Sequence, residues 1–68
     1  MPNGVVSWFD SGKGFGFITP DAGGPEVFVE YTELVGAGFR TLRAGQRVEF
    51  GVRETRRGPE AQHVRVVE

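Results

Sequence analysis

The chain has 68 residues, and eight Lys and Arg against nine Asp and Glu give it a formal net charge of −1. It has no cysteine, which excludes disulfides, thiolate metal sites and a cysteine nucleophile. No segment has the composition of a signal peptide or a bilayer-spanning helix, so we expect a cytoplasmic protein with a single domain over residues 1–68. Eleven glycines and four prolines predict short strands with frequent turns.

Five strands are predicted, and in chain order they cover residues 4–10, 15–19, 26–31, 46–55 and 61–67. A single helical turn is predicted at residues 32–34, and a glycine-rich loop follows it. Alternation predicts inward positions for Val48, Phe50 and Val52 in the fourth strand, and for Val64 and Val66 in the fifth. Short strands without a helical stripe or a linker predict an all-β fold in the form of a small closed barrel.

The second and third strands carry aromatic and aliphatic side chains on opposite faces. Successive residues of a strand face opposite sides, so Phe15 and Phe17 share one face, and Phe28 projects away from its two neighbours. The aliphatic residues on the other faces are Ile18, Val27 and Val29.

Hydrophobicity alone leaves both orientations open, since burying each ring is worth roughly 1.5–3 kcal/mol but exposes the aliphatic set. Gly14 and Gly16 lie on the side of Ile18, where glycine lets barrel strands bend and approach closely. This favours an outward aromatic patch. With Lys13 beside it, such a patch suits stacked bases and phosphates.

Trp8 and Phe9 are adjacent, so a regular strand cannot place both on one face. Either Phe9 points inward and Trp8 outward, or a bulge bends the strand at this point.

Several runs together resemble the bacterial cold-shock proteins, and they follow in the family's order over essentially the whole chain. The runs are residues 4–9, 12–18, 27–31, 38–42, 45–50 and 58–61. The resemblance implies a five-stranded antiparallel Greek-key barrel of the oligonucleotide/oligosaccharide-binding (OB) type. It also implies a protein that binds single-stranded RNA and DNA with little sequence preference and acts as a nucleic-acid chaperone without ATP, in gene expression or in the response to cold. We expect a monomer, because the apolar patch is already assigned to this ligand.

The resemblance also identifies candidate binding residues. Positions that match nucleic-acid contacts of the family are Trp8, Lys13, Phe15, Phe17, Phe28, Phe39 and Arg57, with Tyr31 at a position that commonly holds Phe or Tyr. The chain departs from the family at Ser7, Asp10 and Glu30, where lysine, asparagine and histidine are usual.

Glu30 is a candidate site residue with two open interpretations. As a tolerated exposed substitution, it lowers affinity by repelling the nucleic-acid backbone, as does Glu26 on the same side of the strand. As a base reader, its carboxylate accepts a hydrogen bond from the exocyclic amine of cytosine.

Catalysis, a cofactor and a metal site are not expected. His63 is the only histidine, and it has no evident carboxylate or nucleophile partner. An RNA-recognition motif needs two helices that this chain lacks, and a phosphate-binding glycine loop needs a spacing that is absent here. The remaining alternative is a small barrel that docks a peptide on its aromatic face.

Overall fold

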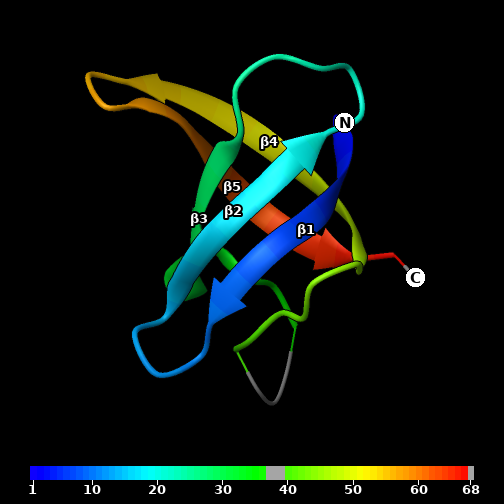
Figure 1. The fold of residues 1–68 in the computed structure, drawn as a ribbon, viewed down its shortest axis with the longest axis vertical. Coiled ribbons are helices and arrows are strands. Elements are labelled where there is room, and N and C mark those ends of the chain that lie inside the picture. The colour runs from blue at the N-terminus through cyan, green and yellow to red at the C-terminus, as the bar shows by residue number, and fades with distance from the viewer. Residues whose placement is uncertain (37–39, 68) are drawn as a thin grey trace.

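The computed structural model describes residues 1–36 and 40–67 of the chain. Within these ranges, five strands and one short 3-10 helix, η1, follow one another along the chain (Figure 1). Their bounds are β1 (Asn3–Asp10), β2 (Phe15–Pro20), β3 (Val27–Glu30), η1 (Tyr31–Glu33), β4 (Arg47–Thr55) and β5 (Gly58–Val66). Each predicted strand overlaps an observed one. The largest difference is at β5, which begins at Gly58 because the β4–β5 turn is shorter than expected.

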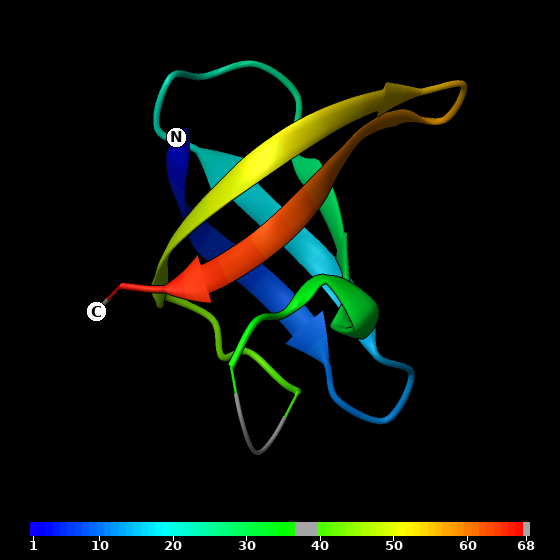
Figure 2. The same ribbon diagram turned by 180° about the vertical axis from the view of Figure 1, so that it is seen from behind.

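The strands form a closed barrel in the order β1-β2-β3-β5-β4. In Figure 1 β1 and β2 lie in front of β4 and β5, and Figure 2 shows β4 and β5 from behind. The predicted all-β barrel is confirmed, but it is not purely antiparallel, because β3 and β5 pair in parallel through Phe28 and Glu60. A ring of five strands cannot alternate direction at every step, so one neighbouring pair must be parallel.

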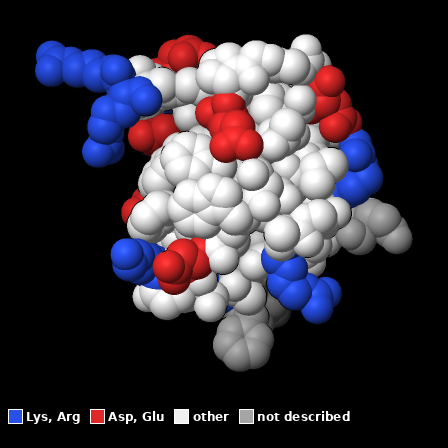
Figure 3. All heavy atoms as spheres, viewed as in Figure 1, with Lys and Arg blue, Asp and Glu red and all other residues white. Residues whose placement is uncertain are grey.

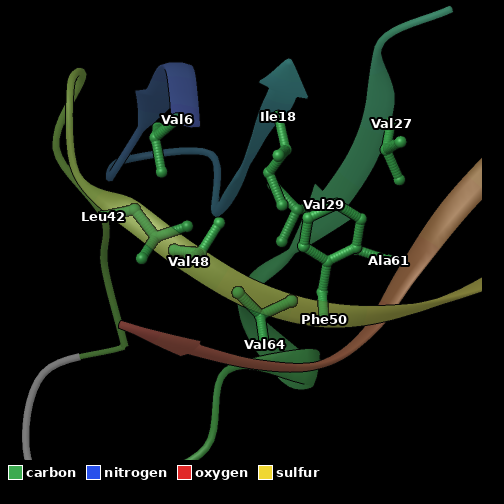
Figure 4. Close-up of a cluster of buried hydrophobic side chains, with 9 residues drawn as sticks. All are labelled: Val6, Ile18, Val27, Val29, Leu42, Val48, Phe50, Ala61 and Val64. Carbon is green, nitrogen blue, oxygen red and sulfur yellow. The ribbon is translucent and has the colours of Figure 1, made fainter. Parts of the chain in front are cut away.

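Nine buried side chains fill the interior of the barrel (Figure 4). Every strand contributes to this core. The set is Val6, Ile18, Val27, Val29, Leu42, Val48, Phe50, Ala61 and Val64. The predicted aliphatic face of β2 and β3 and the inward positions of Val48, Phe50 and Val64 are therefore confirmed.

A β-bulge in β1 reverses the alternation of that strand. Val6 pairs with Ile18, yet the next paired residue, Trp8, lies opposite Phe17, so Ser7 is an extra residue. Trp8 consequently faces the same side as Phe17, while Phe9 packs against the core. The two alternatives predicted for this pair are therefore both correct, because the bulge turns Trp8 outward and Phe9 inward.

Two inward assignments from the sequence are wrong. Val52 is 41% exposed because it lies in the β4–β5 hairpin, which extends beyond the barrel at the upper left of Figure 1. Val66 is 47% exposed and is the last residue of β5, at the rim of the barrel. Alternation identifies the side of a strand but does not indicate where the strand leaves the core.

Replacing Gly16 by alanine is expected to destabilise the barrel. A Cβ atom at this position would lie 2.1 Å from the carbonyl oxygen of Trp8 and 2.7 Å from the Cα of Phe9, so the backbone at the bulge must move. We expect a loss of about 2–3 kcal/mol in the free energy of unfolding, as for severe overpacking. Urea unfolding followed by Trp8 fluorescence measures it.

Gly51→Ala is the matched control, because Gly51 also lies within a strand and its nearest atom to a new Cβ is 3.8 Å away. This variant is expected to stay within about 1 kcal/mol of the parent. Equal stability of the two variants would show that the close approach of β1 and β2 is not required.

Candidate nucleic-acid interface

Four aromatic rings form a continuous cluster on the outer side of β1, β2 and β3. The centroid of Trp8 lies 5.8 Å from that of Phe15 and 5.5 Å from that of Phe17. Phe28 lies 5.8 Å from both phenylalanines. These separations are those of packed aromatic pairs, so the rings support one another outside the core.

Strand register arranges the rings in two rows across the sheet. In the first row Phe15 lies between Asp10 of β1 and Glu30 of β3. In the second row Trp8, Phe17 and Phe28 lie side by side, and Glu60 of β5 follows them. Each row of aromatic residues therefore has a carboxylate at an end.

The ring cluster is accessible to solvent. Trp8 is 43% exposed, and the three phenylalanines are partly buried by one another. Figure 3 shows the same side of the molecule as Figure 1, and its middle is mainly uncharged, with blue Lys and Arg atoms toward the margins. A surface of this kind can stack planar groups, while phosphate-binding cations reach it from its edges.

Lys13 and Tyr31 lie at one margin of the cluster, beside the β1–β2 turn. The Lys13 amide donates to the Asp10 carboxylate at 2.9 Å, and the Tyr31 amide donates to the carbonyl of Gly14 at 2.8 Å. Gly14 has a φ of 80°, and a Cβ there would lie 2.8 Å from the Tyr31 ring. Glycine therefore allows Tyr31, which is 46% exposed, to rest on this turn.

Arg57 lies at the other margin, in the turn between β4 and β5. Its Nη2 atom is 3.9 Å from Oε2 of Glu60, whose Oε1 accepts a hydrogen bond from Arg53 at 3.2 Å. The Arg57 side chain is 89% exposed, whereas Glu60 is only 17% exposed. Arg57 can consequently swing toward a ligand, while Glu60 is held in place.

Within residues 1–36 and 40–67, four arginines have acidic partners. Besides the two arginines on Glu60, Arg47 is paired with Asp21 and Arg65 with Glu49. The hydrogen bond from Arg65 lowers the pKa of Glu49 below its usual value. These pairs reduce the positive charge available to a polyanion.

Residues 2–67 match the model of the 'Cold-shock' DNA-binding domain. The chain belongs to the cold-shock domain family. The resemblance noted in the sequence is thereby confirmed, and membership implies nucleic-acid binding.

Relatives in three bacteria support the assignment. The chain is 54% identical over 67 residues to a probable cold shock protein A of Mycolicibacterium smegmatis, covering 98% of this chain and all of the relative. It is 55% identical to a cold shock-like protein of Thermotoga maritima, covering 96% and 97% of the two chains. It is 51% identical to the cold shock-like protein CspG of Escherichia coli K12, covering 90% and 87%.

A solved structure shares the fold at much lower identity. The chain titled drosophila Unr CSD456 superposes with a TM-score of 0.81 at 21% identity, covering 98% of this chain and 26% of that one. The shared barrel architecture is therefore compatible with extensive sequence change.

The cold-shock domain brings most of the predicted site residues to one face. Trp8, Phe15, Phe17 and Phe28 form the ring cluster, and Glu30 ends its first row. Lys13, Tyr31 and Arg57 lie at the margins of this cluster. Phe39, which was also predicted, lies outside the described residues.

Sequence reasoning did not assign a role to Glu60, Pro59 or Arg53. Glu60 and Pro59 line a hollow with Phe17 and Phe28, and Arg53 holds Glu60. The motif at residues 58–61 was noted, but its position beside Phe28 depends on the parallel β3–β5 pair. That pairing is a long-range property without a local sequence signal.

Within residues 1–36 and 40–67, no helix is both long and apolar enough to cross a bilayer. Nor is any group of three His, Cys, Asp or Glu side chains in those ranges placed to hold a metal ion.

Replacing a ring of the cluster is expected to cost less stability than replacing a core ring. Phe50 is fully buried, so Phe50→Ala is expected to destabilise by about 3–5 kcal/mol. Phe17→Ala loses partly exposed contacts with Trp8 and Phe28, and we expect about 1–2 kcal/mol. Thermal and urea unfolding compare the two. A larger loss for Phe17→Ala would mean that the cluster is primarily structural.

Proposed function

We propose that the protein binds single-stranded RNA and DNA by stacking bases on the four-ring cluster and its neighbour Tyr31. The observation that carries this proposal is the continuous, solvent-accessible contact of Trp8, Phe15, Phe17 and Phe28 outside the hydrophobic core. Lys13, Arg57 and Phe39 complete the proposed interface. Since every base has a π-face, stacking tolerates many sequences.

Stacking dominates the proposed affinity. Each base stacked on an aromatic side chain is worth about 1–3 kcal/mol by alanine substitution. The electrostatic contribution is smaller, because the net charge is −1 and Arg47, Arg53 and Arg65 are each paired with a carboxylate. The exposed carboxylate of Glu30 further opposes the approach of phosphates.

Chaperone activity follows from this mode of binding without ATP. The rings can stack only on bases that are unpaired, so the protein binds the open strand in preference to the duplex. Binding therefore shifts a weak duplex toward its open form by mass action. We propose that the protein acts as a monomer in this role, which in its family is associated with gene expression and the cold-shock response.

Oligonucleotide binding is expected to depend on the rings. Short single strands should quench Trp8 fluorescence, and a duplex of the same length should not. Phe17→Ala is expected to weaken binding about 5- to 150-fold, corresponding to one lost stacking contact. Fluorescence titration at a temperature where the variant remains folded gives both results.

Val66→Ala is the control, since Val66 is exposed at the end of β5 and belongs to neither ring row. Its affinity should equal that of the parent. Absence of Trp8 quenching by any single strand would overturn the proposal and favour the alternative, a barrel that docks peptides on its aromatic face.

The salt dependence of binding is expected to be shallow. With about two to four phosphates neutralised by Lys13, Arg57 and nearby arginines, the slope of log affinity against log salt should be about −1.5 to −3. Titration at several salt concentrations measures this slope. A value of about −5 or steeper would mean that phosphate contacts, and not stacking, carry the affinity.

A further inference from the structure

The short helix η1 connects the margin of the ring cluster to another part of the barrel. It begins at Tyr31, whose side chain is exposed beside the β1–β2 turn, and none of its side chains is buried. Figure 2 shows η1, in green, at the end of the barrel that also carries the β1–β2 turn. Because no side chain of η1 is buried, the position of this helix depends on its polar contacts and on the residues next to it.

Backbone hydrogen bonds attach both ends of η1 to the barrel. At its start, the Tyr31 amide donates to the carbonyl of Gly14 at 2.8 Å. Directly after its end, the Val35 amide donates to the carbonyl of Val64 in β5 at 2.9 Å, and Leu34 forms a parallel bridge with Val64. The helix therefore lies between the β1–β2 turn and β5.

A side chain of η1 makes a further contact, at a bulge in β5. The pairing of β4 with β5 shifts between Glu49 and Gly51, where β5 has one more residue than β4. His63 lies in this bulge with a φ of 51°, a conformation that residues other than glycine adopt uncommonly. Its amide donates to Oε1 of Glu33 at 3.3 Å. The carboxylate of η1 thus binds the backbone of β5 where that backbone is irregular.

We propose that Glu33 is a positioning residue for the nucleic-acid interface: its contact with the His63 amide fixes η1, and η1 places the ring of Tyr31 beside the cluster. The inference rests on the proposed function, in which Tyr31 stacks a base. A carboxylate is a strong acceptor for a backbone amide. Without this contact η1 is less ordered, so binding must also order the Tyr31 ring, and that cost reduces the affinity.

The sign of the effect separates positioning from charge. A carboxylate on a protein that binds a polyanion opposes binding, so loss of the Glu33 charge alone would strengthen binding or leave it unchanged. Loss of the positioning contact weakens binding instead. Glu33→Ala removes both the charge and the contact, whereas Glu33→Gln removes the charge and keeps an oxygen that can accept the His63 amide.

Titrations of the parent and of both variants with short oligodeoxythymidine, followed by Trp8 fluorescence, test the inference. Glu33→Ala is expected to weaken binding about three- to tenfold, a fraction of one whole stacking contact. Glu33→Gln is expected to bind as tightly as the parent or more tightly. Thermal unfolding sets a temperature at which every variant is folded, so that the loss does not reflect unfolded protein.

A double-mutant cycle identifies the residue through which Glu33 acts. Tyr31→Ala alone should weaken binding about 5- to 150-fold, and adding Glu33→Ala should cause no further weakening, because no ring is left to position. Glu49→Ala is the matched control. It removes a carboxylate on β4 that also accepts a hydrogen bond, from Arg65 at 2.7 Å, and its affinity should not fall below that of the parent.

Three results would overturn the inference: unchanged or tighter binding by Glu33→Ala, equal weakening by Glu33→Gln and Glu33→Ala, or a further loss when Glu33→Ala is added to Tyr31→Ala. In each of these cases the parent still binds, so the proposed function stands. If the parent bound no single strand, the proposed function would fail, and the inference with it.

Discussion

The close approach of β1 and β2 at Gly16 is the constraint on which the outer surface depends. Ser7 is an extra residue in β1, and it turns Trp8 from the side of Val6 to the side of Phe17. The bulged backbone lies so near β2 that only glycine fits opposite it. Without this contact, regular alternation would direct Trp8 toward the core and Phe9 toward solvent. One backbone irregularity thus completes both the core and the ring cluster.

Local features of the sequence were sufficient to predict much of the fold and of the candidate site. Period-two alternation separates Phe15 and Phe17 from Ile18, and the glycine at position 16 indicates which set faces inward. The features that could not be predicted depend on contacts between residues far apart in the sequence. Val52 alternates correctly, but its hairpin extends beyond the barrel, and Glu60 reaches Phe28 only through the β3–β5 pairing. An odd number of strands requires one parallel neighbouring pair, but it does not determine that the pair is β3–β5 or which residues meet there.

The arginine ion pairs and the stacking rings occupy separate regions of the molecular surface. The arginines that pair with Asp21, Glu49 and Glu60 stabilise the surface of the barrel locally and contribute little field at a distance. The rings form a separate cluster whose rows end at carboxylates, and on the face shown in Figure 3 the Lys and Arg atoms lie toward the margins. A net charge near zero is therefore consistent with binding a polyanion, provided that affinity comes mainly from base stacking. Such a protein would also release its strands readily, which suits a chaperone that acts by mass action.

The separation of core from surface explains how the outer face of such a barrel can change without loss of the fold. The Drosophila structure retains the architecture at 21% identity, so the fold tolerates change at most positions. None of the ring-row residues, including Glu30 and Glu60, belongs to the nine-residue core. Substitutions at the ends of the rows can therefore alter the groups that meet a base edge without changing the interior packing. In the proposed mode, the rings supply affinity for any base, because every base has a π-face.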